Sequence, residues 1–204
     1  MADVKTRWGA NKHPHETLVR FVQRNWRHAP DRSRVRFLDI GCGAGANAQY
    51  LAEEGFSVTA LDEQKGAIEE LERRLIRGRD PNGKPDNRLL NLCERVVCDA
   101  CNWEYPERHY DCVIDNLSLC HVRRPPYLWI YDTLKPGGIF WCATPHDKYC
   151  WRGVAEGKDY TRFASQKQLR DLLGNRWKQV KFLDEHYFDE DDNPIYSWII
   201  KAYK

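Results

Sequence analysis

Short apolar runs alternate with amphipathic stretches along most of this chain, beginning at Val35. Strands are predicted at 35–40, 57–61, 95–98, 110–119 and 139–143. Helices are predicted at 46–54, 66–76, 125–134 and 165–173. Strands that alternate with helices in this way predict an α/β domain with a mostly parallel sheet and helices on both faces.

The C-terminal part of the chain predicts a different arrangement. Two further apolar runs, 179–183 and 196–202, flank the acidic, proline-ended segment 189–194. A polar turn segment between two such runs is typical of a hairpin. We therefore expect a sheet of seven strands, of which the last two form an antiparallel hairpin.

The first 33 residues precede the first predicted strand. They contain one predicted helix, 17–26, with Leu18, Phe21 and Val22 on one side. The segment ahead of that helix is rich in hydrogen-bonding groups. We expect residues 1–33 to form a cap or lid, although a surface arm that only covers the sheet fits the same pattern.

Length and charge narrow the function classes. At 204 residues the chain suits one domain, which we place at residues 34–204. Lys plus Arg total 32 and Asp plus Glu total 30, so the net charge of +2 produces no strong field that would attract nucleic acid. Nucleic acid is thus permitted as a partner but not indicated.

The eight cysteines indicate a reducing compartment, since most lie inside apolar runs, where a thiol behaves as a small hydrophobe. Cys98 and Cys101 form a CxxC pair, but no second pair or histidine at zinc spacing accompanies them, so we expect no metal site. The chain has no apolar leader and no run of 18 apolar residues. We therefore expect a cytoplasmic protein without a membrane span.

The end of the first predicted strand carries the strongest chemical signal. Asp39 lies two residues before Gly41-Cys42-Gly43-Ala44-Gly45, and glycines allow a ligand to approach the backbone closely. Asp62, at the end of the second strand, can accept hydrogen bonds from both hydroxyls of a ribose. The spacing GxGxG differs from the GxGxxG of a pyrophosphate loop, but Ala46 fits the looser form of that pattern. These residues alone fit either a dinucleotide or another adenosine-containing ligand.

Two further features follow in order along the chain: Cys98-Asp99-Ala100 after the third strand, and Leu134–Phe140 (LKPGGIF) before the fifth. Together with Phe37–Asn47 (FLDIGCGAGAN) and Asp62, they resemble the class I S-adenosylmethionine-dependent methyltransferases over residues 34–143. The LKPGG segment is typical of the small-molecule, ubiquinone-pathway and tellurite-resistance types. The resemblance implies a Rossmann-like fold, S-adenosylmethionine as the cofactor and S-adenosylhomocysteine as its product.

The resemblance also implies roles for single residues at the glycine segment. The backbone at Gly41, Gly43 and Gly45 would line the methionine and ribose parts of the cofactor. Asp39 would lie near the methionine amino group, and Asp62 would bind the ribose.

Later residues take further roles by the same resemblance. Asp99 would accept a hydrogen bond from the adenine amino group, beside the backbone of Ala100. An aspartate that only caps its own loop is the alternative for Asp99. Asn116 and Leu117, at the end of the fourth strand, would lie by the methionine part.

The acceptor pocket is expected outside the carboxyl ends of the strands, where ligands bind in open α/β sheets. The residues that we select as acceptor contacts are Trp8, Asn11, His13, Tyr149, Trp151 and Arg152. His121 and His146 are candidate general bases, because a histidine titrates near neutral pH, although either could serve only to cap a helix or satisfy a carbonyl. The mixture of aromatic and charged groups in 144–163 favours a modest-sized acceptor.

The sequence therefore predicts in-line transfer of a methyl group to O, N or S of a small molecule, by a monomer or a homodimer. Two alternatives stay open. A nucleic-acid methyltransferase would use the basic face Arg73, Arg74, Arg77, Arg79, Lys84 and Arg88, and its binding would weaken steeply with salt. A non-catalytic subunit would bind the cofactor without transferring its methyl group.

Overall fold

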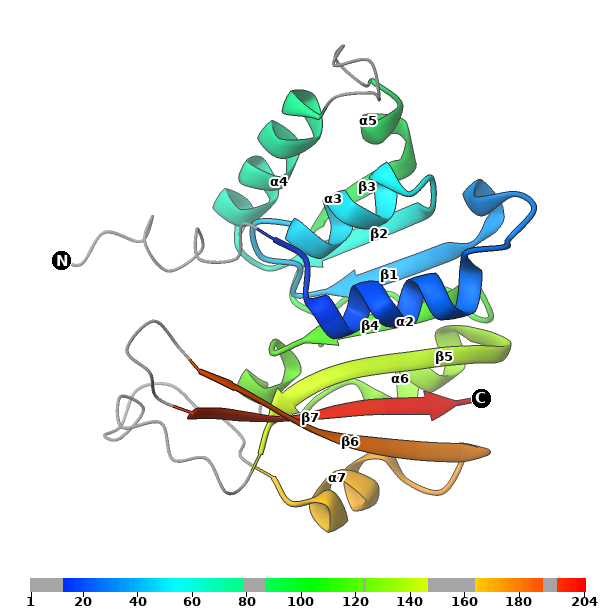
Figure 1. Cartoon of the computed structure of the whole chain (residues 1–204), viewed down its shortest axis with the longest axis vertical. Helices are drawn as coiled ribbons and strands as arrows, with labels where there is room; N and C mark the ends of the chain where they lie inside the picture. The colour runs from blue at the N-terminus through cyan, green and yellow to red at the C-terminus, as the bar shows by residue number, and fades with distance from the viewer. Residues whose placement is uncertain (1–12, 79–86, 123, 147–163, 189–193) are drawn as a thin grey trace, which may run out of the picture. The chain divides into compact units, whose positions relative to one another are not determined.

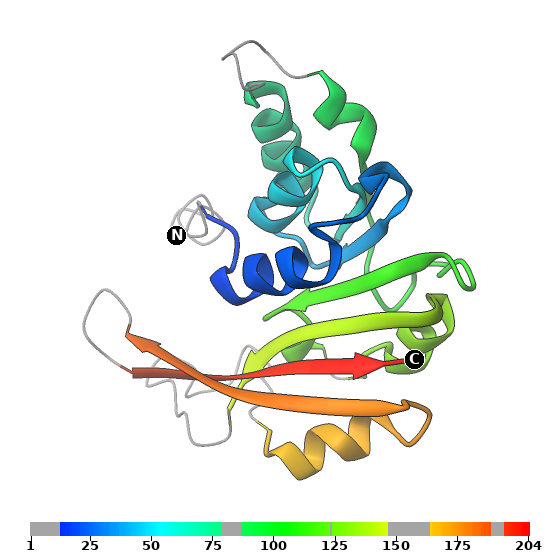
Figure 2. The same cartoon turned by 45° about the vertical axis from the view of Figure 1, so that its right-hand side comes forward.

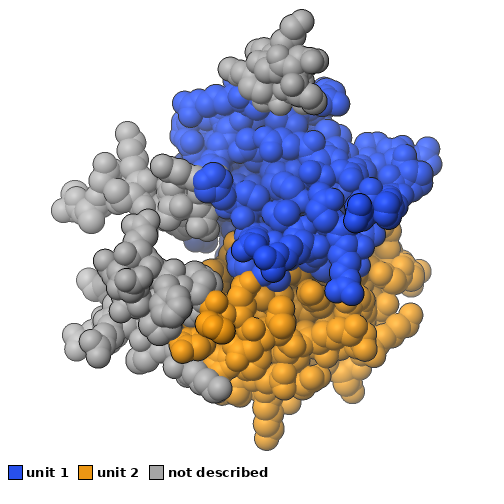
Figure 3. All heavy atoms as spheres, viewed as in Figure 1, with its two compact units in different colours: residues 1–103 blue, residues 104–204 orange. Residues whose placement is uncertain are grey.

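The structure is a computed structural model that describes residues 13–78, 87–122, 124–146, 164–188 and 194–204. The chain divides into two compact units, residues 1–103 and 104–204 (Figure 3). Among the described residues, no helix combines the length and the apolar character needed to cross a lipid bilayer.

The first unit is built from three parallel strands and the helices beside them (Figure 1). Its elements are α2 (Glu16–Trp26), η1 (Arg32–Arg34), β1 (Arg36–Ile40), α3 (Ala46–Glu53), β2 (Ser57–Asp62), α4 (Lys65–Arg77), α5 (Arg88–Leu92) and β3 (Cys93–Val97). β2 pairs in parallel with β1 on one side and with β3 on the other. The carboxyl ends of the three strands therefore meet at one edge of the sheet.

The apolar faces of these elements explain why they fold where they do. Phe37, Leu38 and Ile40 in β1 are fully buried, as expected for a parallel strand that is covered on both faces. α3 and α4 both contact β2. Leu18, Phe21 and Val22 of α2 are also buried, which confirms the helix and the inward face predicted for it.

The second unit contains the other strands. Its elements are β4 (Tyr110–Asn116), η2 (Leu119–His121), α6 (Tyr127–Thr133), β5 (Leu134–Pro145), α7 (Gln166–Leu173), β6 (Gln179–Phe188) and β7 (Pro194–Tyr203). β4 and β5 pair in parallel, whereas β7 pairs antiparallel with both β5 and β6. Figure 2 shows β6 and β7 as long neighbouring arrows of opposite direction.

The seven strands follow the order β3-β2-β1-β4-β5-β7-β6. This confirms the predicted α/β class: a seven-stranded, mostly parallel sheet that ends in an antiparallel hairpin and is accompanied by helices. The alternating pattern of the sequence was sufficient for this prediction because the central strands β1, β2, β4 and β5 are formed by strongly apolar runs that become buried.

Three local features differ from the prediction. The predicted strand 110–119 ends at Asn116 in β4, and Leu119 already belongs to η2. α5 was missed, because five residues are too few to show a helical period. The LKPGG segment, which we placed as a turn ahead of the predicted strand 139–143, lies inside β5, which begins at Leu134. Tyr110 pairs with Leu134 and Cys112 with Ile139, so the LKPGG segment forms an irregularity within the strand and not a turn before it.

Candidate functional site

A glycine-rich loop joins β1 to α3 at the carboxyl end of β1. Gly41, Gly43 and Gly45 have φ angles of 62°, 55° and 81°, in the left-handed region that a side chain disfavours. Gly45 is also the N-cap of α3, so the helix begins directly at the loop. The sequence FLDIGCGAGAN therefore places half-buried to buried backbone, without bulky side chains, at the edge where the parallel strands end.

Two of these glycines are needed for different reasons. A Cβ atom on Gly43 would have no atom within 4 Å, so the space beside its backbone is open. A Cβ atom on Gly45 would lie 2.3 Å from Cδ1 of Leu71 in α4. Gly43 thus leaves room for a ligand, whereas Gly45 allows α4 to pack against the start of α3.

Asp62 ends β2 and holds the glycine loop. Its carboxylate accepts hydrogen bonds from the amide of Gly43 at 2.9 Å and from the amide of Gln64 at 2.8 Å. Burial raises the pKa of Asp62, and the two amide donors act in the opposite sense. Since an ionised carboxylate has about four acceptor positions, two remain for further donors.

Asp39 and Asp62 lie on neighbouring strands and flank the same loop residue, Cys42. Asp39 is 1% exposed and Asp62 is 6% exposed. Burial raises the pKa of the Cys42 thiol well above its usual value, and the negative charges of Asp39 and Asp62 raise it further. Two acidic groups at the ends of β1 and β2 therefore lie beside the loop in a partly dehydrated setting, which suits a ligand with positive charge and hydroxyl donors.

Asp99 follows β3, and its carboxylate contacts its own loop. It accepts a hydrogen bond from the amide of Cys101 at 2.8 Å and from the side-chain amide of Asn102 at 3.2 Å. This is the loop-capping geometry that the sequence left open as an alternative. The carboxylate keeps further acceptor positions, so a hydrogen bond to adenine remains compatible with this geometry and stays a prediction. The contact of the Ala100 backbone with adenine also stays a prediction, and Ala100 is half-buried.

Most of the predicted acceptor contacts lie outside the described residues. These are Trp8, Asn11, Tyr149, Trp151 and Arg152. His13 is described and is exposed. Two residues later, the amide of His15 donates to the side-chain oxygen of Asn47 in α3 at 2.9 Å, which attaches the start of α2 to the helix that follows the glycine loop.

In the second unit, the chain leaves β4 through a turn that Asp115 holds. One carboxylate oxygen accepts hydrogen bonds from the amides of Ser118 at 2.9 Å and Leu119 at 3.0 Å. The other accepts from the thiol of Cys142 in β5 at 3.2 Å. Burial raises the pKa of Asp115 to about 6, against the effect of these donors.

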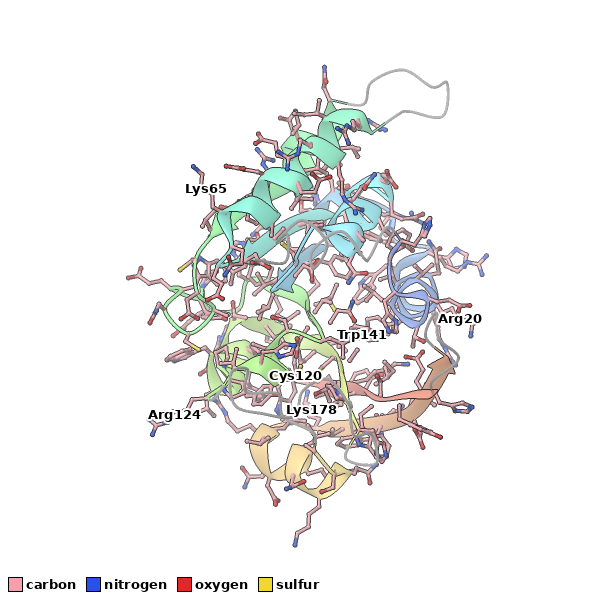
Figure 4. The ribbon with its side chains drawn as sticks, turned by 90° about the vertical axis from the view of Figure 1, so that its left-hand side faces the viewer. Arg20, Lys65, Cys120, Arg124, Trp141 and Lys178 are labelled. Carbon is pink, nitrogen blue, oxygen red and sulfur yellow. The ribbon has the colours of Figure 1, made fainter. Side chains whose placement is uncertain are left out.

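Of the predicted cofactor residues, Asn116 is the last residue of β4 and Leu117 is the first residue of this turn. Leu117 has a φ of 60°, which is uncommon for a residue with a side chain. Its amide donates to the carbonyl of Ala143 at 2.9 Å, and its carbonyl accepts from the thiol of Cys120 at 3.3 Å. Cys120, labelled in Figure 4, is 3% exposed.

The two candidate bases have different surroundings. His121 is exposed at the end of η2. His146 is 2% exposed, and its ring stacks on Trp198 with 4.2 Å between ring centroids. Its amide also donates to the carbonyl of Tyr196 at 3.2 Å. His146 is therefore packed as a core residue, whereas His121 is accessible.

Sequence reasoning missed the part that Asp115 plays at the end of β4. A signal was present, because an acidic residue inside the apolar run at 110–119 is seldom buried without hydrogen-bond partners. Its partners come from a turn and from the next strand of the sheet, however, and the sequence does not indicate which residues meet there.

Asp115 leads to a prediction about stability and pH. Because its folded pKa is raised from 3.8 to about 6, the folded protein keeps a proton between about pH 4 and pH 6 that the unfolded chain releases. The free energy of unfolding should therefore fall as pH rises through this window, by up to about 3 kcal/mol from this group. Asp115→Asn removes the contribution, so in urea titrations from pH 4.5 to 7.5 its stability relative to the wild type should rise with pH. A difference that does not vary with pH would contradict this assignment.

Within the described residues, no cluster of three or more His, Cys, Asp and Glu side chains is arranged to hold a metal ion. The cysteines described there are thiols and form no disulfide.

A family model and a relative of this chain both identify it as a methyltransferase. The sequence model of a family described as "Methyltransferase domain" matches residues 10–191. The ubiquinone biosynthesis O-methyltransferase of Rickettsia felis is 42% identical over an alignment that covers 86% of this chain and 73% of that protein.

Two further similarities are broader. The malonyl-[acyl-carrier protein] O-methyltransferase of Enterobacter lignolyticus is 27% identical over 71% of this chain, which spans 55% of the length of that relative. A crystal structure of a SAM-dependent methyltransferase from Methanosarcina mazei aligns with 94% of this chain and 98% of its own, with a TM-score of 0.70 and 18% identity. At that identity the alignment supports the fold.

Proposed function

Because this chain belongs to the methyltransferase-domain family and is a class I S-adenosylmethionine-dependent methyltransferase, we propose that it transfers a methyl group to an oxygen of a small molecule. The observation that carries the choice of oxygen is the 42% identity, over 86% of the chain, to an enzyme named as a ubiquinone biosynthesis O-methyltransferase. The second relative is also named as an O-methyltransferase. An oxygen acceptor on a small molecule is therefore favoured over N or S acceptors.

The first unit fits the adenosine and methionine parts of the cofactor. Asp62 has two acceptor positions left, as many as the hydroxyls of a ribose, and the space beside Gly43 is open. In this proposal the backbone at Gly41, Gly43 and Gly45 lines the ligand, and Asp39 attracts its amino group. When bound, S-adenosylmethionine supplies a methyl group on a positively charged sulfur, and S-adenosylhomocysteine is left after transfer.

The remaining cofactor contacts are proposed from the family resemblance. The Asp99 carboxylate accepts a hydrogen bond from the adenine amino group through acceptor positions that Cys101 and Asn102 do not use. The backbone of Ala100 lies beside the adenine. Asn116 and Leu117 contact the methionine part. Residues 1–33 act as the cap over the ligand, and the hydrogen bond from His15 to Asn47 supports an attachment of this segment at α3.

For the acceptor, this chain needs to orient a hydroxyl group and to remove its proton. Alignment supplies much of the acceleration in a displacement of this kind. We assign the general base to His121, because an exposed imidazole can reach a substrate whereas His146 is stacked on Trp198. The contacts proposed from the sequence are Trp8, Asn11, His13, Tyr149, Trp151 and Arg152.

The proposal is tested by following a labelled methyl group. The full chain is incubated with methyl-labelled S-adenosylmethionine and a panel of phenols, alcohols, carboxylic acids, amines and thiols, and the products are identified by mass spectrometry. Label on an oxygen supports the proposal. Label on nitrogen or sulfur, or in added RNA or DNA, overturns it, and so does tight cofactor binding without transfer to any acceptor of the panel or of a metabolite extract.

A further inference from the structure

We propose that Asp115 is a positioning residue, whose buried carboxylate fixes the turn at 117–119 and so orients the residues that contact the methionine part of the cofactor. The identity of that ligand rests on the proposed function. The fixing of the turn rests on hydrogen bonds within the second unit alone.

The carboxylate joins three segments of the chain. It belongs to β4, it accepts from two successive amides of the turn at 2.9 and 3.0 Å, and it accepts from Cys142 in β5 at 3.2 Å. A hydrogen bond to an ionised acceptor is roughly twice as strong as one between neutral groups. Ser118 and Leu119 are therefore tied to β4 and, through the thiol, to β5.

Leu117, which precedes the two amides bound by Asp115, has a backbone conformation that its surroundings must stabilise. Leu117 has a φ of 60°, and a residue with a side chain adopts this region only when its surroundings favour it. The hydrogen bond from its amide to Ala143 holds one side of the residue, and the thiol of Cys120 holds its carbonyl. Asp115 completes this arrangement because its carboxylate accepts hydrogen bonds from the amides of Ser118 and Leu119, the two residues that follow Leu117.

The position of the carboxylate is unfavourable for stability, which argues that it serves more than packing. Asp115 is 1% exposed, and the titratable groups that face it are thiols: Cys142 from β5 and, beside Cys142, Cys120 from η2. Burial also raises the pKa of Cys142 well above its usual value, so this thiol remains a neutral donor. Within the described part of the chain, no cation acts on the pKa of Asp115 to offset the burial of its charge. A neutral residue would relieve that penalty but would hold the turn with weaker hydrogen bonds.

The test compares two aspartates of the same strand. Asp115→Asn keeps the size of the side chain and removes its charge, and Asp111→Asn makes the same change at the other end of β4, where Asp111 pairs with Lys135 at 2.7 Å. At pH 8 we expect Asp115→Asn to bind S-adenosylmethionine about tenfold more weakly while unfolding at equal or higher urea concentration. Asp111→Asn should stay within about twofold of the wild type. Weaker binding together with undiminished stability is a result that a merely structural role would not produce.

The pH profile gives a second readout. Affinity of the wild type should decrease as pH is lowered from about 7 to about 5, where Asp115 takes up a proton, and this component should be absent in Asp115→Asn. Equal affinity of Asp115→Asn and the wild type at pH 8, or identical pH profiles, would overturn the proposal. If Asp115→Asn does not fold, Cys142→Ala removes one donor to the carboxylate and should weaken binding in the same direction by a smaller factor.

Amide hydrogen exchange separates this proposal from the function that it refines. In Asp115→Asn the amides of Ser118 and Leu119 should exchange faster than in the wild type or in Asp111→Asn. A wild-type protein that binds neither S-adenosylmethionine nor S-adenosylhomocysteine refutes the proposed function, whatever the exchange data show. Unchanged exchange at both amides, in a wild type that does bind the cofactor, refutes the role of Asp115 alone.

Discussion

Replacing Asp62 with alanine is expected to weaken the binding of both S-adenosylmethionine and S-adenosylhomocysteine by on the order of 100-fold. The expected loss corresponds to about 3 kcal/mol, the worth of two hydrogen bonds from ribose hydroxyls to an ionised acceptor. The same substitution removes the acceptor for the amide of Gly43, so the glycine loop should also become less ordered. Isothermal titration calorimetry with each ligand measures the effect.

The neighbouring Glu63 provides the matched control for this experiment. Glu63 is exposed and also acidic, so Glu63→Ala changes the charge at the same place in the chain without removing a buried acceptor. We expect its affinity to stay within about twofold of the wild type. Asp62→Asn should bind more tightly than Asp62→Ala, because an amide oxygen can still accept one hydrogen bond. Unaltered affinity in Asp62→Ala would remove the central contact of the proposed site.

The sequence was informative about this part of the site because its signals are local. The loop Gly41–Gly45 follows directly on β1, and Asp62 stands at the end of the next strand. In a parallel sheet the ends of neighbouring strands lie at one edge, so the pattern of strands alone brought these residues together. The hydrogen bond that Asp62 accepts from the amide of Gly43 agrees with the expectation that these residues lie close together.

Other features depend on contacts that no local pattern contains. Gly45 must be glycine because of Leu71, which lies 26 positions later and on another helix. Asp115 meets Cys142 only because β4 pairs with β5 in a register that the LKPGG segment shifts. The stacking of His146 on Trp198 likewise requires the pairing of β5 with β7. Each of these follows from tertiary packing, which a sequence pattern constrains only in outline.

Gly45→Ala is expected to reduce the free energy of unfolding by about 2–5 kcal/mol. Two effects contribute. A φ of 81° is unfavourable for alanine by about 1–2 kcal/mol. The new Cβ atom would also lie 2.3 Å from Leu71, and relieving such overpacking costs about 1–3 kcal/mol. Urea denaturation measures the sum.

Gly43→Ala is the matched comparison, since its φ of 55° is equally unfavourable but its Cβ would meet no atom within 4 Å. We expect it to lower stability by about 1–2 kcal/mol while weakening S-adenosylmethionine binding by at least about tenfold, because the methyl group would enter the space assigned to the ligand. A double-mutant cycle separates the two causes at Gly45. In a Leu71→Ala background the contacts with Cδ1 at 2.3 Å and with Cγ at 2.9 Å are removed, and only the contact with Cβ of residue 71 at 2.9 Å remains. Gly45→Ala should therefore cost less there than in the wild type and approach the part that comes from φ. If the cost in that background were as large as in the wild type, the packing of α4 against the loop would not be the reason for glycine at this position.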